Sequence, residues 1–485
     1  MTEIELKFQI PDARRNALLK ALDPKKSETI SLQARYYDTA DRLLAQHGIA
    51  LRQRLEGTRW VQTLKAGKTH IERFEHNHDL GELHQPPALD LSIYDAAPEA
   101  RQLLDAVLSQ TESPLQLQFE TDMTRTLRVI QLDEVEIEAS LDVGCIRSGE
   151  REYPVHEVEF ELKSGSVQAL LAFCFEWVKK YQLWLDVRSK AEMGNLLALD
   201  LKVSPPRLAE EFRLNKKASA DQNLRLLIAQ QLQHLLPNIA AISAGINQAE
   251  HIVQAQNALN QLYLTVHLLK DWSASISEKW ANQLLAFRQQ FDQLQHLEHM
   301  QNTLGTFLQN PNTASNLAKD ILYAKEKLAN LVKSTQNVHH YLELLMFSLD
   351  EDASHPAQDL KQAAQQTLQH QYKLLQEQLN QTSQTDFDSL DQLAQKINAL
   401  KFIFPVLTTI YDVKNLQKYS KALNDAQLAA QEYQVLSSAA LYIQQTELEA
   451  SDWFVLGWLT AKQEVHAQAL LDATEQFLVS RKFIK

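Results

Sequence analysis

The chain has 485 residues, of which 45% are hydrophobic, a formal net charge of −13 and two cysteines. This length predicts two or three domains, and the negative charge argues against a general binder of nucleic acid or of anionic membranes. Two cysteines exclude a disulfide framework and a zinc site built from several thiolates. The sequence has no apolar leader and no apolar run of about 18 residues. We therefore expect a cytoplasmic enzyme or binding protein.

The first ten residues, MTEIELKFQI, alternate polar and apolar side chains. This alternation predicts a β-strand with two unlike faces. One face is apolar, and the other carries Glu3, Glu5 and Lys7.

Short runs of the same kind continue through the first 200 residues. They occupy residues 50–55, 59–67, 69–78, 126–142 and 156–165. Helical patterns cover residues 11–22 and 166–184, and Ser166 is a suitable N-cap for the second. Many strands with few helices predict an α+β domain, with a closed barrel as one arrangement.

The sequence changes character after residue 202. Pro205 and Pro206 predict a linker over residues 203–217, because proline interrupts helices. From residue 218 to the end, long runs of Leu, Ala and Gln repeat with helical spacing, which predicts an all-helical bundle. The expected organisation is a domain over 1–202, this linker and a helical domain over 218–485.

Charged side chains line one face of each predicted strand. A single charged face is typical of an antiparallel sheet that meets solvent. Six such strands favour a closed sheet whose charged faces meet in one lumen, with the apolar faces packed outward against helices. The charged sets are Arg52 and Arg54; Lys65; Arg73 and Glu75; Glu136, Glu138 and Asp142; and Glu157, Glu159, Glu161 and Lys163.

These residue types indicate a site that binds both a metal ion and a phosphate compound. Clustered carboxylates without paired thiols favour Mg²⁺ or Mn²⁺ over zinc. Arginines spaced by two residues suit phosphate oxygens, and the combination favours metal-assisted cleavage of a polyanion such as a triphosphate. Because the sequence has no glycine-rich phosphate loop, side chains would hold the phosphates.

Eight motifs in order resemble the CYTH domain, the triphosphate tunnel family. They are EIELKF, YYDT, LRQR, TLK, TRT, SLDVG, EVEFEL and SKAEMG, and they cover residues 1 to about 200. The resemblance implies an eight-stranded antiparallel tunnel. The family includes inorganic triphosphatases, thiamine triphosphatases, RNA capping triphosphatases and one class of adenylate cyclase.

The resemblance also implies roles for residues. Metal ligands would be Glu3, Glu5, Asp142, Glu157 and Glu159, with Glu136 and Glu138 as weaker candidates. The phosphate chain would be held by Lys7, Arg52, Arg54, Lys65, Arg125 and Lys190, with Arg73 as a weaker candidate. We assign catalysis to Lys7, Arg52, Arg54, Lys65 and Glu159. One Mg²⁺ or Mn²⁺ would bridge the phosphates, and a second would polarise the attacking water.

The helical half resembles the CHAD domain, which often follows CYTH and normally carries basic residues one helical turn after a histidine. His251 is present here, but the following turns offer Gln254, Ala258, Leu259 and Gln261. The resemblance therefore implies a degenerate CHAD domain that supports the tunnel or docks a protein, rather than one that binds polyphosphate.

The leading hypothesis is an enzyme that hydrolyses inorganic triphosphate to pyrophosphate and phosphate, with neither nucleic acid nor a membrane as partner. Three alternatives remain: an adenylate cyclase, a hydrolase of another organic triphosphate, and a non-catalytic module that binds polyphosphate or nucleotide. The sequence shows no base-recognition pocket for a cyclase. The presence of all the predicted metal carboxylates argues against a purely binding module.

Overall fold

A computed structural model of the chain describes residues 2–67, 69, 71–304, 311–350, 358–410, 416–444 and 450–480. The chain divides into two compact units. Unit 1 contains Met1–Arg207, Gln233–Ile252 and Leu331–Met346, and unit 2 contains Leu208–Leu232, Val253–Asn330 and Phe347–Lys485. Among the described helices, none has the length and apolar character needed to cross a bilayer.

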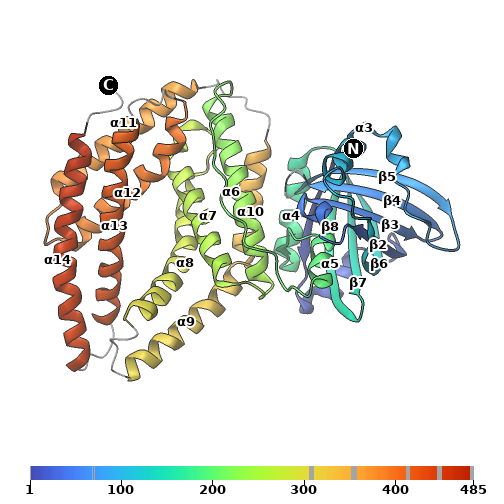
Figure 1. Ribbon diagram of the computed structural model, residues 1–485, viewed down its shortest axis with the longest axis horizontal. Coiled ribbons are helices and arrows are strands. Elements are labelled where there is room, and N and C mark those ends of the chain that lie inside the picture. The colour runs from blue at the N-terminus through green and yellow to red at the C-terminus, as the bar shows by residue number, and fades with distance from the viewer. Residues whose placement is uncertain are drawn as a thin grey trace. The chain divides into compact units, whose positions relative to one another are not determined.

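The described strands of unit 1 form one antiparallel sheet (Figure 1). They are β1 (Thr2–Gln9), β2 (Glu28–Asp38), β3 (Ile49–Glu56), β4 (Arg59–Gly67), β5 (Glu72–Glu82), β6 (Gln116–Leu132), β7 (Val135–Ser148), β8 (Arg151–Ser164) and β9 (Trp184–Leu185). Their order is β5-β4-β3-β2-β6-β7-β8-β1-β9, and β1 also pairs with β5. The first eight strands therefore close into a barrel, which confirms the predicted fold class and the eight-stranded tunnel.

Strand β1 closes the barrel because it changes partner along its length. Thr2 pairs with Phe74 on β5, whereas Glu5 pairs with Glu161 on β8. Closure leaves no free sheet edge between β5 and β8, so both neighbours of β1 satisfy its backbone groups. The short strand β9 adds to the end of β1, where Phe8 pairs with Leu185.

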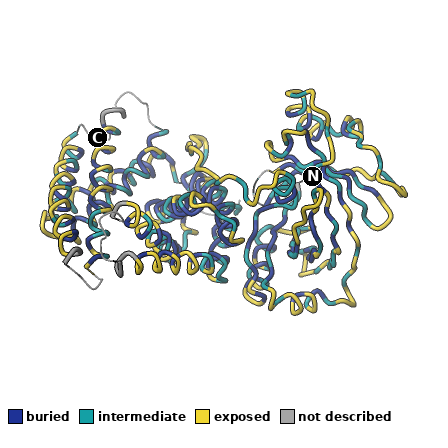
Figure 2. The backbone as a smooth tube through the Cα atoms, turned by 60° about the horizontal axis from the view of Figure 1, so that its bottom comes forward, coloured by how far each residue is buried: buried dark blue, intermediate teal, exposed yellow. Residues whose placement is uncertain are grey.

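Where helices cover the barrel its outer face is apolar, as predicted, but on β2 and β6 the outer face is polar and partly exposed, as at the Arg35–Glu120 ion pair. Phe160 on β8 contacts Phe173 and Trp177 of α4 (Val167–Tyr181), with ring centroids 5.2 Å apart in both pairs. On another side, Leu64 of β4 belongs to a buried cluster with Leu104 of α3 (Pro98–Leu108). Figure 2 shows the strands mostly buried or half-buried, with exposed residues gathered at the connecting turns.

Helix α5 (Lys190–Ala198) packs against the inner face of the sheet. Leu32, Ala34 and Met123 line the lumen and share a buried cluster with Met193 of this helix. A Cβ atom on Gly194 would lie 2.2 Å from the ring of Phe119, so only glycine permits this approach. The packing fixes the first residue of α5, Lys190, inside the barrel.

The predicted elements agree with the structure in most places. Residues 11–22 form a 3₁₀ turn (Asp12–Arg14) and α1 (Arg15–Ala21), and Ser166 caps α4 by accepting a hydrogen bond from the Ala169 amide at 3.2 Å. The prediction of one run over 126–142 was wrong, because Asp133, with φ of 51°, turns the chain between β6 and β7. Strand β2, helix α3, α2 (Leu43–Gln46) and a 3₁₀ turn (Ser92–Ala96) were not predicted.

The rest of the described chain is helical, which confirms the predicted all-helical region. Its elements are α6 (Ala220–Ser243), α7 (Ala249–Leu268), a 3₁₀ turn (Lys270–Trp272), α8 (Glu278–Leu304), α9 (Pro311–Leu331), α10 (Thr335–Leu349), α11 (Leu360–Gln381), α12 (Phe387–Thr408), α13 (Leu416–Gln444) and α14 (Ala450–Val479). Residues 201–219 contain no helix or strand and include the predicted linker. The domain limits 1–202 and 218–485 stay predictions, since unit 1 also takes two segments of the helical region.

Candidate active site

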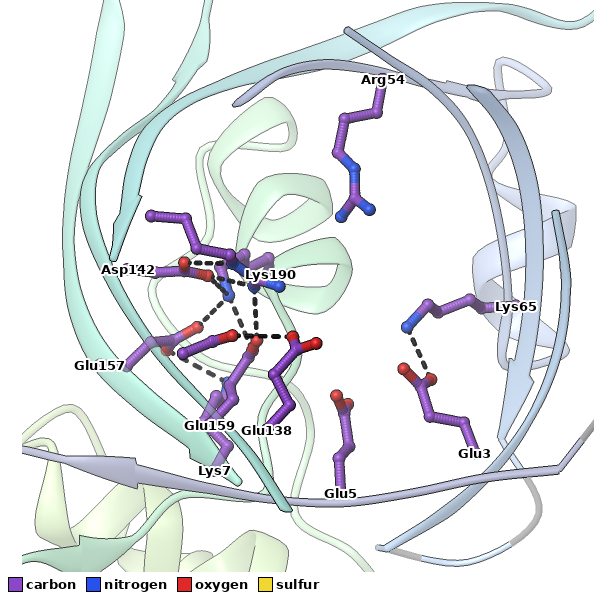
Figure 3. Close-up of polar contacts among 12 residues, drawn as sticks. Glu3, Glu5, Lys7, Arg54, Lys65, Glu138, Asp142, Glu157, Glu159 and Lys190 are labelled. Carbon is purple, nitrogen blue, oxygen red and sulfur yellow. Dashed lines mark hydrogen bonds and ion pairs between the residues drawn. The ribbon is translucent and has the colours of Figure 1, made fainter. Parts of the chain in front are cut away.

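The lumen of the barrel is a charged cavity of about 940 Å³. Strands β1, β3, β4, β5, β6, β7 and β8 and the start of α5 each contribute predicted site residues to its wall. These residues are Glu3, Glu5, Lys7, Arg52, Arg54, Lys65, Arg73, Arg125, Asp142, Glu159 and Lys190. Figure 3 shows the labelled members pointing inward from several sides of the ring of strands. Glu157, the remaining predicted residue, contacts Lys190 beside this cavity.

Asp142, Glu157 and Glu159 form a carboxylate triad. Each offers an oxygen atom, and these atoms lie within 4.8 Å of one another. The triad forms because β7 and β8 are neighbours, with Asp142 opposite Glu157 and with Glu159 two residues farther along the same face. Asp142 and Glu157 have no exposed side-chain surface, and Glu159 has 15%.

The ammonium group of Lys190 lies at the centre of this triad. Its Nζ atom is 2.8 Å from Asp142, 2.5 Å from Glu157 and 2.8 Å from Glu159 (Figure 3). Arg125 adds two hydrogen bonds to Asp142, both at 2.6 Å, and one to Glu159 at 2.7 Å. Burial favours the neutral forms of Glu159 and Lys190, but the ion pairs outweigh burial. As a result, the pKa of Glu159 lies far below its usual value, and the pKa of Lys190 lies far above its usual value.

A second charged cluster occupies the wall built by β1, β4 and β5. Lys65 donates a hydrogen bond to Glu3 at 2.6 Å and lies 3.4 Å from Glu75, while Arg73 lies 2.7 Å from Glu5. Burial and the carboxylates of Glu5 and Glu75 raise the pKa of Glu3 to about 7, although Lys65 opposes them. Against the effect of burial, Lys65 and Arg52 lower the pKa of Glu75 to about 2.

The cations of β3 lie close together in the cavity. Arg54 Nε donates to Glu56 at 2.7 Å, and Arg52 lies 3.7 Å from Glu75 and 3.5 Å from the hydroxyl of Tyr36. Burial and the guanidinium of Arg52 lower the pKa of Arg54, although Glu56 raises it. An anion bound between these guanidinium groups would offset the repulsion between their positive charges.

Several buried polar atoms in or beside the lumen have no hydrogen-bond partner among the described residues. They include Lys7 Nζ and Arg52 Nε. Lys7 Nζ is 3.4 Å from Glu157 Oε2, which is an ion pair without hydrogen-bond geometry. Buried groups of this kind normally have partners, so these atoms fit a site that takes a charged ligand.

The triad fits a divalent metal ion. Its donors are oxygen atoms only, which suits Mg²⁺ or Mn²⁺, and they already surround a cation of the chain itself. Of the weaker candidates, Glu138 lines the cavity and accepts a hydrogen bond from Ser140 at 3.0 Å, whereas Glu136 is not among the lining residues. The sheet register shifts between Glu136 and Ile137, which explains why the alternation does not carry Glu136 into the lumen.

Sequence reasoning missed a buried ion pair next to β1, between Arg188 and Asp186. Arg188 donates to Asp186 from Nε at 3.0 Å and from Nη2 at 2.7 Å, and Gln9 donates to the same carboxylate at 3.2 Å. The Asp186 amide also donates to the carbonyl of Lys7 at 3.0 Å. These contacts tie the segment before α5 to β1. The signal in the sequence was the spacing of Asp186 and Arg188 by two residues, which places opposite charges close together, but these residues lie outside the predicted strands.

The YYDT motif has a structural role at its aspartate. Asp38 is buried and accepts hydrogen bonds from the amides of Thr39, Leu44 and Ala45 at 2.7 to 2.9 Å. It therefore caps α2 rather than facing the lumen. Tyr36, from the same motif, lines the cavity and stacks on Phe119 with ring centroids 4.5 Å apart.

Comparison with known proteins agrees with this architecture. Residues 1–193 match the model of the CYTH domain. An inorganic triphosphatase from Haemophilus influenzae is 33% identical over 166 residues, a match that covers 33% of this chain and 44% of that protein. The match therefore spans less than half the length of this relative.

The helical region also has a structural relative. The crystal structure of the CHAD domain from the plant Ricinus communis aligns with a TM-score of 0.50 and 16% identity, over 57% of this chain and 98% of that chain. At this identity the likeness shows a shared fold alone, and it confirms the predicted CHAD-like fold. For the barrel, the residues that match the CYTH model, 1–193, include all eight strands that close the sheet, so the match and the fold cover the same part of the chain.

Proposed function

We propose that the chain hydrolyses inorganic triphosphate to pyrophosphate and phosphate in the lumen of its barrel, with help from Mg²⁺ or Mn²⁺. The main support is that Asp142 and Glu159 of the carboxylate triad line the same cavity as a group of cations from β3, β4 and β6, with Glu157 directly beside it. The relative that is 33% identical over 166 residues is named an inorganic triphosphatase.

The carboxylates have the role of holding the metal. Asp142, Glu157 and Glu159 would hold one ion on one wall, and Glu3 and Glu5 would hold a second ion on the other. When bound, such ions neutralise phosphate charge and lower the pKa of a bound water. The low pKa of Glu159 keeps its carboxylate ionised for this purpose.

The cations orient the phosphate chain. Arg52 and Arg54 offer planar groups that match phosphate oxygens, with Lys7, Lys65, Arg125 and Lys190 around them and Arg73 as a weaker contact. Water attacks the terminal phosphorus as the bond to the bridging oxygen breaks, and the bridging electron pair leaves with pyrophosphate. The same cations stabilise negative charge on the transferred and leaving groups.

A substrate panel tests the proposal. The full chain with Mg²⁺ is offered inorganic triphosphate, ATP, thiamine triphosphate and long polyphosphate, and both phosphate and cyclic AMP are measured. We expect phosphate release, fastest from inorganic triphosphate. Cyclic AMP formation would support the cyclase alternative instead, faster release from an organic triphosphate would change the substrate, and binding without turnover would support a binding module.

The remaining expectations accompany this proposal as predictions. They are a cytoplasmic location, the absence of nucleic-acid and membrane partners, and a supporting or docking role for the helical region. The same assay on a chain with the helical region removed would test whether that region is needed for turnover.

A further inference from the structure

We propose that the ammonium group of Lys190 and a divalent metal ion compete for one position at the centre of the carboxylate triad, so that the metal must displace Lys190 to bind. The displaced lysine then becomes a phosphate ligand. This inference rests on the proposed metal-dependent function, and it assigns to Lys190 a second role, as the counter-ion of the metal-free site.

The geometry leaves room for one cation. Lys190 Nζ contacts all three carboxylates, at 2.5 to 2.8 Å. An Mg²⁺ ion at the same centre would hold its oxygens at about 2.1 Å, so the triad needs to contract by only a fraction of an ångström around it. Two cations cannot share this centre, because they would repel at contact distance in a buried site.

The metal-free site needs the lysine. Asp142 and Glu157 are completely buried, and Glu159 is 15% exposed. Carboxylates in this position are strongly destabilising without a positive partner. Arg125 supplies part of the compensation at Asp142 and Glu159, and Lys7 forms an ion pair with Glu157 at 3.4 Å. Of these three cations, Lys190 is the one that contacts all three carboxylates, and at the shorter distance to Glu157.

The position of Lys190 in the chain allows its ammonium group to move while its backbone stays fixed. Lys190 is the first residue of α5, and Ser189 caps that helix by accepting a hydrogen bond from the Glu192 amide at 3.0 Å. The long, flexible lysine stem can turn without disturbing the cap. The same stem can then carry the charge toward the region of Arg52 and Arg54, where the phosphates are expected.

Metal titration without substrate tests the competition. Mn²⁺ is titrated into the metal-free full chain by calorimetry, for the wild type, Lys190→Met and Lys163→Met. Lys163 is the matched control, because it pairs with Glu138 and Glu161 outside the triad. We expect Lys190→Met to bind Mn²⁺ at least about tenfold more tightly, and Lys163→Met to bind as the wild type does. Equal, weaker or absent Mn²⁺ binding by Lys190→Met would overturn the proposal.

Thermal unfolding gives an independent readout. In the presence of a chelator, Lys190→Met should melt at a lower temperature than the wild type, and Mn²⁺ should raise its melting temperature by more than it raises that of the wild type. An equal rise in both proteins would contradict the competition.

A measurement on the wild type covers the case in which Lys190→Met fails to fold. The ammonium signal of Lys190, assigned by its loss in Lys190→Arg, is followed by ¹⁵N NMR during addition of diamagnetic Mg²⁺. We expect a protected signal in the metal-free chain that shifts or disappears as Mg²⁺ binds; an unchanged signal at saturating Mg²⁺ would overturn the proposal. None of these readouts needs turnover, so failure of the proposed hydrolysis is detected separately in the substrate panel.

Discussion

At the scale of single residues, Glu3 is the acid expected to change charge near neutral pH. Burial and its acidic neighbours raise its pKa from 4.5 to about 7. The folded state therefore holds a proton on Glu3 that the unfolded state has released between pH 4.5 and about 7. The contribution of Glu3 to stability is complete below pH 4.5 and is lost as the pH rises through 7, whereas its ability to bind a cation increases over the same interval.

The variant Glu3→Gln tests this assignment. We expect the free energy of unfolding of the wild type to fall between pH 5 and 8, relative to the variant, by about 2 kcal/mol. Denaturant unfolding at several pH values measures the difference. Glu82→Gln, at an exposed position of β5, is the control and should follow the wild type. Parallel pH profiles for the wild type and Glu3→Gln would show that Glu3 ionises at its ordinary pKa.

Arg54 is the residue at which loss of phosphate binding should be clearest. It is half-buried in the lumen beside Arg52, and its carboxylate partner is the lumen residue Glu56. Arg54→Ala should lower the rate of phosphate release from triphosphate by about a hundredfold to a thousandfold. Arg59→Ala removes an arginine that is 52% exposed and paired with Asp79, and it should keep the wild-type rate. Equal rates in both variants would remove Arg54 from the proposed mechanism.

At the scale of elements, the position of α5 depends on Gly194. Replacing a helical glycine by alanine usually stabilises a helix, by up to about 1 kcal/mol. At Gly194 the added Cβ would meet the ring of Phe119 at 2.2 to 2.5 Å, whereas at Gly457 in α14 nothing lies within 4 Å. We expect Gly194→Ala to destabilise the chain by about 1–3 kcal/mol and Gly457→Ala to be neutral or stabilising. Urea unfolding compares them.

The Gly194 substitution should also disturb the site. Because α5 begins with Lys190, a shift of the helix moves the ammonium group relative to the carboxylate triad. Mn²⁺ affinity should therefore change in Gly194→Ala and stay constant in Gly457→Ala. A stable Gly194→Ala chain with wild-type affinity would mean that Phe119 can move aside without moving α5.

Asp38, next to helix α2, is expected to stabilise the fold rather than take part in catalysis. Asp38 satisfies three backbone amides from a buried position. Asp38→Ala leaves these donors without their acceptor and should destabilise the chain by about 2–4 kcal/mol. Phosphate release per folded molecule should stay close to the wild-type value. A large loss of activity in a stable Asp38→Ala chain would instead place Asp38 in the chemistry.

At the scale of the whole molecule, unit 1 extends beyond the predicted limit of residue 202. It includes Gln233–Ile252 and Leu331–Met346, and within it His339 Nε2 lies 3.1 Å from the carbonyl oxygen of Phe175. A chain that ends at residue 202 should therefore keep the triad but show faster hydrogen exchange at the amides of α4 than the full chain. Equal exchange would show that residues 1–202 are a self-sufficient domain, as the sequence predicted.

Much of the barrel could be predicted because strand alternation is a local property. The inward placement of Glu3, Arg52, Lys65 and Glu159 follows once the sheet closes. Strand β2 alternates in the same way and could have been predicted as a strand, but its orientation could not: Leu32 and its lumen-facing neighbours are apolar, since they meet α5 rather than a ligand. No local pattern in residues 28–38 indicates that partner.

The sequence by itself determined which residues carry charge, which of them share a strand face, and where sheet gives way to helix, because these properties depend on neighbours within a few positions along the chain. Only the tertiary structure decided that Lys190 meets Asp142, Glu157 and Glu159, that Lys65 meets Glu3, and that Glu3 has a pKa of about 7. Those contacts join residues that are 31 to 62 positions apart in the sequence. The pKa of Glu3 depends on the burial and the neighbouring charges that closure of the barrel creates.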